Sequence, residues 1–441
     1  MKGLRYGEAI DYLYGLQRMG IKFGLENITR ILDAIGNPHE RLTVIHVAGS
    51  NGKGSTAAHL ESVLMKAGYR VGLYTSPHLL SFNERIRIDR QEISEEEVVE
   101  FTNRVLDILP ELRDAAAQDS PLPITFFEFT TAMAFDYFFR KDTDLAILEV
   151  GMGGRLDATN VCRPLVCVIT SVSLEHQEYL GRTLVEIAGE KAGIVKRGVP
   201  VVLGVCHPKA REVVEEICLE RGAPLFYAGR EFKVHGTPEC FSYHGIARSF
   251  QGLSTSLKGR HQIRNASLCL AALEILEKSG YPTGKEAVEK GLKDVLWSGR
   301  QEWYPGPPQI LLDGAHNPEA LRTLCSSLKR DYRFERLRVL MGVMREKDYR
   351  RMLKMLAPTA HEFVFGRPHM DRSLDPWVLQ AEALRLGCRA TVTEEIAQGF
   401  LDLMERAEDE DLICVTGSLF TVGEVLGWIK KNGLQPRGFL T

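Results

Sequence analysis

The chain has 441 residues, enough for two or three domains that each bury a core. Hydrophobic residues make up 44% and charged residues 26%, which is ordinary for a soluble globular protein. The net charge of −3 argues against a nucleic-acid partner, which favours a basic excess. No uncharged apolar run approaches about 20 residues, so we expect no membrane span.

The nine cysteines are scattered without a Cys-x-x-Cys pair. We therefore expect free thiols that are buried as small apolar side chains, as in a reducing cytosol. The N-terminal sequence MKGLRYGEAIDYL lacks the long apolar core of a secretory signal peptide. These features predict a cytoplasmic protein.

Apolar runs rich in β-branched residues alternate with helical patterns in the first half of the chain. We predict buried strands at residues 42–47, 145–150, 165–171 and 199–203. The first strand leads through a glycine-rich turn into a helix at 55–67, which Gly68 can end. Capping boxes at Ser94/Glu97 and Thr183/Glu186 predict two more helix starts. This alternation is typical of a mostly parallel sheet covered on both faces.

Residues 206–261 differ, because their short strand-like pieces indicate a small antiparallel element before a helix at 262–278. Residues 303–308 (WYPGPP) carry three prolines in six positions, which predicts a linker. Beyond them the alternation restarts, with strands expected at 310–313, 338–343, 362–365 and 412–416. We predict a larger N-terminal α/β domain over residues 1–301 and a smaller C-terminal α/β domain over 302–441.

A glycine-rich loop, AGSNGKGST at residues 48–56, lies between a predicted strand and a predicted helix. Glycines such as Gly52 and Gly54 let several backbone N–H groups point at one anion, and the helix adds its N-terminal dipole. Lys53 can neutralise outer phosphates, while Ser55 or Thr56 can offer a hydroxyl to Mg²⁺. The loop predicts a nucleotide site but no reaction, since kinases, GTPases and ligases all use one.

Four other polar residues stand near predicted strand ends or in a helix. Glu149 closes an otherwise apolar strand, where a carboxylate is unfavourable unless it binds a cation or accepts hydrogen bonds. On the residues alone, Ser76 before a proline is typical of a turn, and a lone His176 is typical of a structural histidine. Lys191 would ordinarily be a solvated helix residue.

Four motifs occur in order: AGSNGKGST at 48–56, TSPHL at 75–79, ILEVGMGGRLDATN at 147–160 and DGAHN at 313–317. Together they resemble the folylpolyglutamate synthase and dihydrofolate synthase family of the Mur ligase superfamily. The resemblance runs from about residue 10 to about residue 425. It implies a phosphate-loop parallel-sheet domain of Mur ligase type and a smaller C-terminal Rossmann-like α/β domain.

The resemblance implies ATP-dependent amide formation, in which a substrate carboxylate attacks the γ-phosphorus of ATP and glutamate then attacks the acyl phosphate. It further implies Mg²⁺, two ions in all. Ser76 and Glu149 match the ligands of one ion, and His176 and Lys191 match those of the other. The matching lysine is carbamylated in the family, which turns a cation into an oxygen donor. Lys53, His176 and Lys191 are the implied catalytic residues. The sequence departs from the family at Glu175, where Asp is common before the histidine.

The resemblance also supplies nucleotide and substrate contacts. The implied ATP-binding residues are Gly52, Lys53, Gly54, Ser55, Thr56, Asn265, Arg300 and Asp313, with His316 and Asn317 ordering the same edge. The implied pteridine-binding residues are Thr125, Phe126, Phe127, Glu128, Leu156, Asp157 and Ala158. Rings in the first segment can stack on a flat heterocycle, and Asp157 can accept its N–H groups. The alternatives are a core aromatic cluster at 125–128, a helix-surface amide at Asn265 and a strand-end turn residue at Asp313.

We expect a bifunctional enzyme that acts on dihydropteroate, folates, L-glutamate and ATP, as a monomer without nucleic-acid or membrane partners. One alternative is an enzyme that only extends folates. A cell-wall Mur ligase is disfavoured, because the phosphate loop begins near residue 48, which leaves no obvious UDP-binding domain before it. A nucleotide-gated GTPase-like regulator is disfavoured, because the guanine-reading NKxD motif is missing from the sequence.

Overall fold

The computed structural model describes residues 3–20, 24–114 and 124–433. The chain separates into two compact units. Unit 1 contains the chain up to His235, together with Ser242–Leu253 and Arg264–Asp294. Unit 2 contains Gly236–Phe241, Ser254–Ile263 and the chain from Val295 onward. The predicted domain division between residues 301 and 302 stays a prediction.

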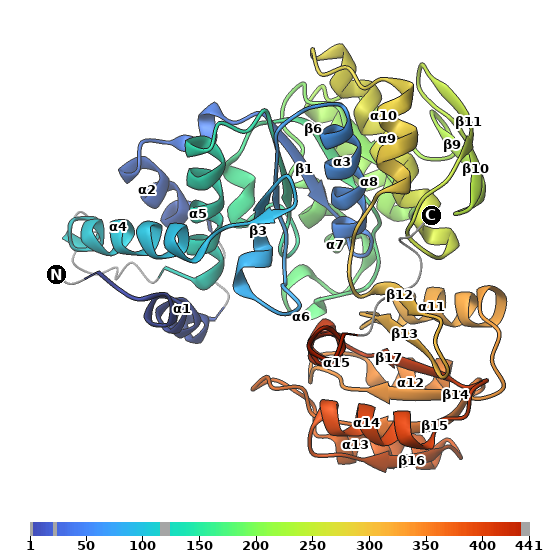
Figure 1. The fold of residues 1–441 in the computed structure, drawn as a ribbon. Coiled ribbons are helices and arrows are strands. Elements are labelled where there is room, and N and C mark those ends of the chain that lie inside the picture. The colour runs from blue at the N-terminus through green and yellow to red at the C-terminus, as the bar shows by residue number, and fades with distance from the viewer. Residues whose placement is uncertain (1–2, 21–23, 115–123, 434–441) are drawn as a thin grey trace. The chain divides into compact units, whose positions relative to one another are not determined.

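The centre of unit 1 is an eight-stranded sheet in the order β4-β3-β2-β5-β1-β6-β7-β8 (Figure 1). Its strands are β1 Val44–Ala48, β2 Val71–Tyr74, β3 Ile86–Ile88, β4 Gln91–Glu92, β5 Leu145–Glu149, β6 Pro164–Ile169, β7 Val201–Leu203 and β8 Leu225–Tyr227. The strands from β2 to β8 in this order are parallel, and β3 and β4 extend the edge antiparallel. Every residue of β1, β2 and β5 is buried, as expected for a parallel sheet covered on both faces.

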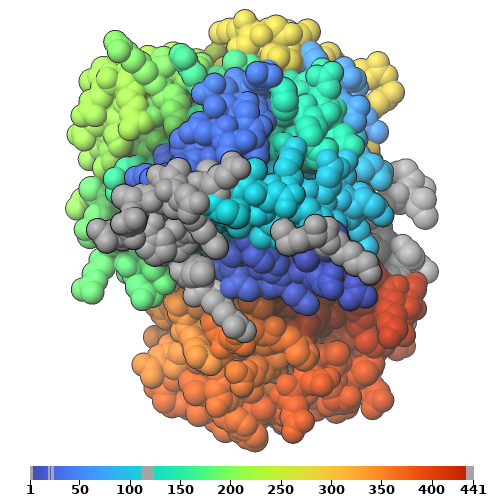
Figure 2. All heavy atoms as spheres, turned by 90° about the vertical axis from the view of Figure 1, so that its left-hand side faces the viewer, coloured from blue at the N-terminus to red at the C-terminus, as the bar shows by residue number. Residues whose placement is uncertain are grey.

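Ten α-helices precede residue 294 in the described part of the chain. They are α1 Tyr6–Gly15, α2 Glu26–Ala34, α3 Lys53–Lys66, α4 Glu95–Asp114, α5 Phe126–Arg140, α6 Gln177–Leu180, α7 Leu184–Ala192, α8 Pro208–Glu220, α9 Arg260–Lys278 and α10 Lys285–Lys293. Figure 2 shows α1, α2, α4 and α5 next to one another, on one face of unit 1. Both predicted helix starts occur, and α7 has the expected Thr183/Glu186 capping box. The sequence did not predict α8.

The predicted antiparallel element is a three-stranded sheet of β9 Lys233–Thr237, β10 Cys240–His244 and β11 Ser249–Leu253. Glu274 of α9 holds its β10–β11 turn. The Glu274 carboxylate accepts the Tyr243 hydroxyl at 2.7 Å and the backbone N–H groups of Ile246, Ala247 and Arg248 at 2.5–3.1 Å. A buried carboxylate with four donors satisfies its charge locally, so it anchors the hairpin to α9.

Unit 2 has a six-stranded sheet in the order β12-β13-β17-β14-β15-β16, with only β12 antiparallel. Its strands are β12 Arg300–Tyr304, β13 Gln309–Asp313, β14 Leu337–Met341, β15 Ala360–Phe365, β16 Arg389–Val392 and β17 Leu412–Thr416. Its helices are α11 Pro318–Asp331, α12 Tyr349–Leu356, α13 Pro376–Arg385, α14 Ile396–Arg406 and α15 Leu419–Lys431. Val339 and Met341 lie in the core cluster of α11, α12 and α13, while Leu340 lies against Gly399 of α14. Alternate residues of β14 therefore face opposite helix layers.

The prediction that residues 303–308 form a linker is wrong. Trp303 and Tyr304 end β12, and residues 305–308 turn the chain into β13. The prolines are tolerated because all three lie in this turn, which needs no ladder hydrogen bonds. With this correction the parallel α/β fold predicted for both halves of the chain is confirmed.

None of the described helices is both long and apolar enough to cross a membrane.

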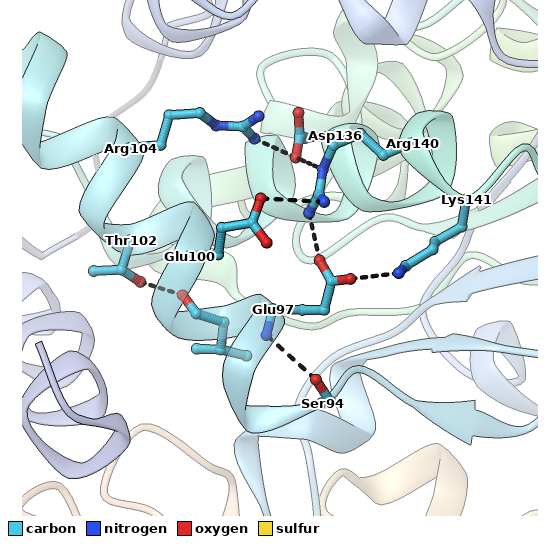
Figure 3. Close-up of polar contacts among 9 residues, drawn as sticks. Ser94, Glu97, Glu100, Thr102, Arg104, Asp136, Arg140 and Lys141 are labelled. Carbon is cyan, nitrogen blue, oxygen red and sulfur yellow. Dashed lines mark hydrogen bonds and ion pairs between the residues drawn. The ribbon is translucent and has the colours of Figure 1, made fainter. Parts of the chain in front are cut away.

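An ion-pair network joins α4 to α5 (Figure 3). Asp136, whose side chain is 4% exposed, pairs with Arg104 and accepts a hydrogen bond from Arg140 at 2.8 Å. Arg140 also reaches Glu97 at 2.6 Å, and Lys141 pairs with the same carboxylate. The single buried carboxylate of Asp136 thus lies between two guanidinium groups.

We expect Asp136→Ala to destabilise unit 1 by about 3 kcal/mol, because it leaves two partly buried cations without their shared partner. Glu100→Ala is the matched control, since the Glu100 side chain is 60% exposed and 3.4 Å from Arg140. It should change stability by less than about 1 kcal/mol. Urea unfolding followed by circular dichroism measures both variants, and equal shifts would contradict this account.

Candidate active site

Four neighbouring parallel strands bring the predicted site residues of unit 1 to one edge of the sheet. In the order β2-β5-β1-β6, Ser76 follows β2, Glu149 ends β5, the glycine-rich loop follows β1, and His176 follows β6. Carboxyl ends of parallel strands form the usual ligand-binding edge of such sheets. Residues far apart in the sequence, from the loop at 48–56 to His176, therefore share one edge.

The glycine-rich loop is held in shape by the segment after β6. Ser50 N–H donates to the Ser171 carbonyl at 2.9 Å, and Asn51 N–H donates to the Ser171 hydroxyl at 2.9 Å. Ser173 N–H in turn donates to the Ser50 hydroxyl at 2.9 Å. Gly49 has a φ of +147°, and a Cβ there would collide with Thr170. The loop is thus preorganised, and only glycine fits at residue 49.

Helix α3 begins at Lys53, two residues before the predicted start. Lys53 Nζ donates to the Gly49 carbonyl at 2.9 Å and to the Ser50 carbonyl at 3.4 Å, so the ammonium group lies across the loop. Ser55 and Thr56 are buried in the first turn of the helix, beside Gly54. Thr56 Oγ1 is buried and has no hydrogen-bond partner among the described residues. The arrangement joins a helix N-terminus, a lysine and hydroxyl groups, which suits a nucleotide phosphate and its cation.

Asn265 of α9 reaches the same loop. A Cβ added to Gly52 would lie 2.6 Å from the Asn265 side-chain oxygen, and Gly52 has a φ of +89°. Asn265 is 8% exposed. The alternative of a helix-surface amide is therefore wrong.

Ser76 and Glu149 are brought together at the ends of β2 and β5. The Ser76 N–H donates to Glu149 Oε2 at 3.4 Å, and Glu149 is 5% exposed. A carboxylate and a serine hydroxyl are hard oxygen donors of the kind that Mg²⁺ prefers. The donor chemistry of this pair therefore fits the predicted ion.

Lys191 of α7 pairs with Glu175 inside the protein. Its Nζ lies 2.6 Å from Glu175 Oε1, and the Lys191 side chain is 1% exposed. Burial lowers the pKa of Lys191 although Glu175 opposes the shift, and Lys53 lowers it further. Burial alone would raise the pKa of Glu175, but Lys191 and Lys53 outweigh it and lower that pKa to about 2. The expectation of a solvated helix lysine is therefore wrong.

The unmodified ammonium of Lys191 does not fit a metal ligand, because it is a cation with no acceptor. A carbamate on the same nitrogen would be an oxygen donor. His176, at the N-terminus of α6, has a φ of +42°, an uncommon conformation for a non-glycine residue. Across the described ranges, no three His, Cys, Asp or Glu side chains lie close enough to hold a metal on their own.

Asp157 organises the glycine-rich turn after β5. Its Oδ2 accepts the Met152 N–H at 3.0 Å, and its Oδ1 accepts the Thr159 N–H at 3.0 Å and the Thr159 hydroxyl at 2.6 Å. The half-buried Phe127 ring lies against Gly151 of the same turn, since a Cβ there would be 2.6 Å from the ring. Phe127 and Asp157 thus contact the same turn, and Leu156 and Ala158 are the chain neighbours of Asp157.

The other predicted pteridine residues have structural contacts. Thr125 and Glu128 form the capping box of α5, and Glu128 Oε2 accepts the Thr125 N–H at 2.8 Å. Phe126 is buried between Tyr14, stacked at 6.0 Å, and Phe82, edge-on at 6.1 Å. The alternative of a core aromatic at a helix start is thus correct for Phe126, whereas the half-buried Phe127 ring lies 5.9 Å from the Tyr74 ring and its contact with a pteridine stays a prediction.

Arg300 and Asp313 belong to unit 2 and lie opposite each other on β12 and β13. Asp313 accepts the N–H groups of Gln301 at 3.1 Å and Ala315 at 2.9 Å. Burial raises the pKa of Asp313 to about 6, although Arg300 opposes the shift. Asp313 therefore acts as a turn residue at the end of its strand, which is the alternative given for it above. Its carboxylate also interacts electrostatically with the Arg300 guanidinium group.

His316 and Asn317 are the remaining residues of the DGAHN motif. Asn317 caps α11 by accepting the Ala320 N–H at 2.9 Å, and His316 Nδ1 lies 2.8 Å from the Gly314 carbonyl. Both side chains shape the turn after β13.

Sequence reasoning missed two polar residues. His46 is fully buried in β1, and Glu175 received no role although it neutralises Lys191. The sequence did carry a signal for His46, because a histidine inside the apolar run LTVIHV needs a polar partner once it is buried. Glu149 was singled out for the same reason. The sequence carried no signal for the pairing of Glu175 with Lys191, because only the folded structure brings α7 next to Glu175.

Comparisons with known proteins agree with these features. The family model of the Mur ligase middle domain matches residues 122–273. The model of the Mur ligase, glutamate ligase domain matches residues 299–419. The chain is 35% identical to dihydrofolate synthase/folylpolyglutamate synthase of Bacillus subtilis over 429 residues, which cover 95% of this chain and 98% of that protein.

Solved structures are similar over nearly the whole chain. Escherichia coli FolC in complex with DHPP and ADP is 30% identical, with a TM-score of 0.86, and the match covers 98% of this chain and 100% of that one. Mycobacterium tuberculosis folylpolyglutamate synthase, complexed with ADP and AMPPCP, is 31% identical, with a TM-score of 0.88 and coverage of 97% and 100%.

Gly52→Ala should weaken nucleotide binding about ten-fold or more, because the new Cβ meets Asn265 and the backbone is strained. Gly68→Ala is the matched control on the far end of α3: its φ of +92° is equally unfavourable, but a Cβ there meets nothing within 4 Å. Isothermal titration with ADP compares the two variants. Equal nucleotide affinities of the two variants would show that the close approach of Asn265 to residue 52 does not affect nucleotide binding.

Proposed function

The chain belongs to the dihydrofolate synthase/folylpolyglutamate synthase family of Mur ligases, which are ATP-dependent amide-forming enzymes, and we propose that it joins L-glutamate to both dihydropteroate and folates. The observation that carries the proposal is the shared sheet edge with the Lys53 loop and Glu149, together with the buried pair of Lys191 and Glu175, on which Lys53 acts electrostatically. A phosphate loop with a nearby carboxylate serves many nucleotide enzymes, whereas nucleotide binding alone does not require the buried Lys191–Glu175 pair.

The proposed reaction has two steps. The substrate carboxylate attacks the γ-phosphorus of ATP, so that ADP leaves and an acyl phosphate forms. The glutamate amine then attacks the acyl carbon, an amide bond forms, and inorganic phosphate leaves. Lys53 and the loop N–H groups stabilise the phosphate charge during transfer, and the buried surroundings keep water from the acyl phosphate.

The proposed nucleotide contacts are those that the family resemblance implies, given for each unit by itself. In unit 1 they are the loop residues Gly52, Lys53, Gly54, Ser55 and Thr56, together with Asn265. In unit 2, Arg300 can pair with phosphate and Asp313 can accept a hydrogen bond from the nucleotide.

Ser76 and Glu149 are the proposed ligands of one Mg²⁺, and His176 and a carbamylated Lys191 those of a second. Mg²⁺ neutralises phosphate charge and polarises the phosphoryl group when it is bound. Carbamylation requires a neutral amine, and the burial that lowers the Lys191 pKa favours that form. Glu175 then serves to hold the amine in place before it is modified.

Phe127 and Asp157 are the proposed centre of the pteridine site, flanked by Leu156 and Ala158. The ring can stack on the heterocycle, and the carboxylate can accept its N–H groups. Thr125, Phe126 and Glu128 hold the start of α5, and thereby the Phe127 ring. We further expect the protein to act in the cytoplasm as a monomer.

A folate-extending enzyme without dihydrofolate synthase activity is the second candidate. The observation that favours it is the set of hydrogen bonds that Asp157 accepts from Met152 and Thr159, which is also what a purely structural turn residue would show.

Steady-state assays with ATP and L-glutamate distinguish the two candidates. With dihydropteroate and with tetrahydrofolate as alternative acceptors, we expect glutamate-dependent ADP release in both cases. Turnover with tetrahydrofolate alone would favour the second candidate, and turnover with neither would overturn the proposed function.

Removal of dissolved CO₂ should lower the activity of the wild-type enzyme at least ~10-fold, because Lys191 then lacks its oxygen donors and a metal ligand is lost. Added bicarbonate should restore activity, whereas Lys191→Ala should stay inactive at any bicarbonate concentration. Insensitivity of the wild type to CO₂, under conditions that strip carbamates, would rule out the modification.

A further inference from the structure

A chain of buried polar groups lies beneath the turn that carries Asp157. Thr159 Oγ1 is 2.6 Å from Asp157 Oδ1 and 2.8 Å from His46 Nε2. On the other side of the imidazole ring, the Cys162 sulfur lies 3.7 Å from Nδ1. His46 and Thr159 are fully buried, and Asp157 is 6% exposed. His46 belongs to β1, whose end leads into the phosphate loop.

The direction of each hydrogen bond follows from the groups present. The Asp157 carboxylate accepts from Met152, Thr159 N–H and the Thr159 hydroxyl, so the single hydroxyl proton of Thr159 points to Asp157. Thr159 Oγ1 must then accept from His46, which places the ring proton on Nε2. Burial, with a smaller contribution from Lys196, lowers the pKa of His46 to about 3, so the ring is neutral and Nδ1 faces the Cys162 thiol as an acceptor.

We propose that His46 and Thr159 are positioning residues that hold the Asp157 carboxylate in the orientation and acceptor-only state needed to recognise the N–H groups of a pteridine. The inference rests on the proposed function, because it assigns Asp157 to substrate. In this relay, from His46 through the Thr159 hydroxyl to Asp157, the hydroxyl donates to Oδ1. The Oδ2 atom accepts only backbone N–H groups, so we assign the Oδ2 side of the carboxylate to the ligand. The relay also ties the pteridine-binding turn to the strand that carries the phosphate loop.

Thr159→Val removes the hydroxyl at nearly constant volume. We expect the KM for dihydropteroate to rise about ten-fold, as for loss of a hydrogen bond to a charged group, with kcat and the KM for ATP changed less than about two-fold. Thr159→Ser should restore the KM for dihydropteroate. Thr102→Val is the matched control, because Thr102 is fully buried and donates at 2.7 Å only to the Val98 carbonyl of its own helix.

Equal rises in the KM values for dihydropteroate and ATP, or the same pattern in Thr102→Val, would show a general structural effect and overturn the proposal. Thermal melts of all variants check that each remains folded at the assay temperature.

Nitrogen-15 NMR of His46 tests the hydrogen bonds from His46 to Asp157 without any substrate. A negative NMR result would therefore count against these hydrogen bonds and not against the proposed function. The spectrum should show a neutral ring protonated at Nε2 throughout the range from about pH 5 to 8. Thr159→Val should shift the Nε2 resonance, while Thr102→Val should not. A ring protonated at Nδ1, or one that becomes cationic in this range, would contradict the proposed direction of the hydrogen bonds.

Discussion

The order and direction of four strands are the constraint on which the site of unit 1 depends. Because β2, β5, β1 and β6 are neighbours and parallel, their carboxyl ends meet at one edge. The backbone there has left the sheet, and its N–H groups are free to form a loop or to begin a helix. Reactive groups can be gathered at this edge without disturbing a core in which every residue of β1, β2 and β5 is buried.

Charge balance is the second feature of this edge. Lys53 and Lys191 are cations near the Glu175 carboxylate, and both act on its pKa. In the unmodified protein the Lys191–Glu175 pair is internally neutral, which allows both groups to be buried. A carbamate on Lys191 would reverse its charge and leave two anions side by side. Modification and binding of a divalent cation are therefore expected to be thermodynamically coupled, each favouring the other.

Local sequence patterns predicted many strands and helices of this protein, but not the side-chain contacts between different elements. The strands at 42–47 and 145–150, the phosphate loop and the isolated Glu149 could be recognised from hydrophobic pattern and residue chemistry alone. The pair of Lys191 with Glu175 and the relay from Asp157 to His46 could not, since each joins residues from different elements. The three prolines after Trp303 indicated a break in regular structure, but an edge hairpin satisfies the same sequence signal as a linker.

Oxygen transfer tests the central claim, glutamate ligation through an acyl phosphate, most directly. Dihydropteroate labelled with oxygen-18 in its carboxylate is turned over with ATP and L-glutamate, and the inorganic phosphate is examined by mass spectrometry. Attack of the carboxylate on the γ-phosphorus predicts one labelled oxygen in each phosphate released. Amide formation with unlabelled phosphate would contradict the acyl-phosphate route, because phosphate would then have taken its fourth oxygen from water.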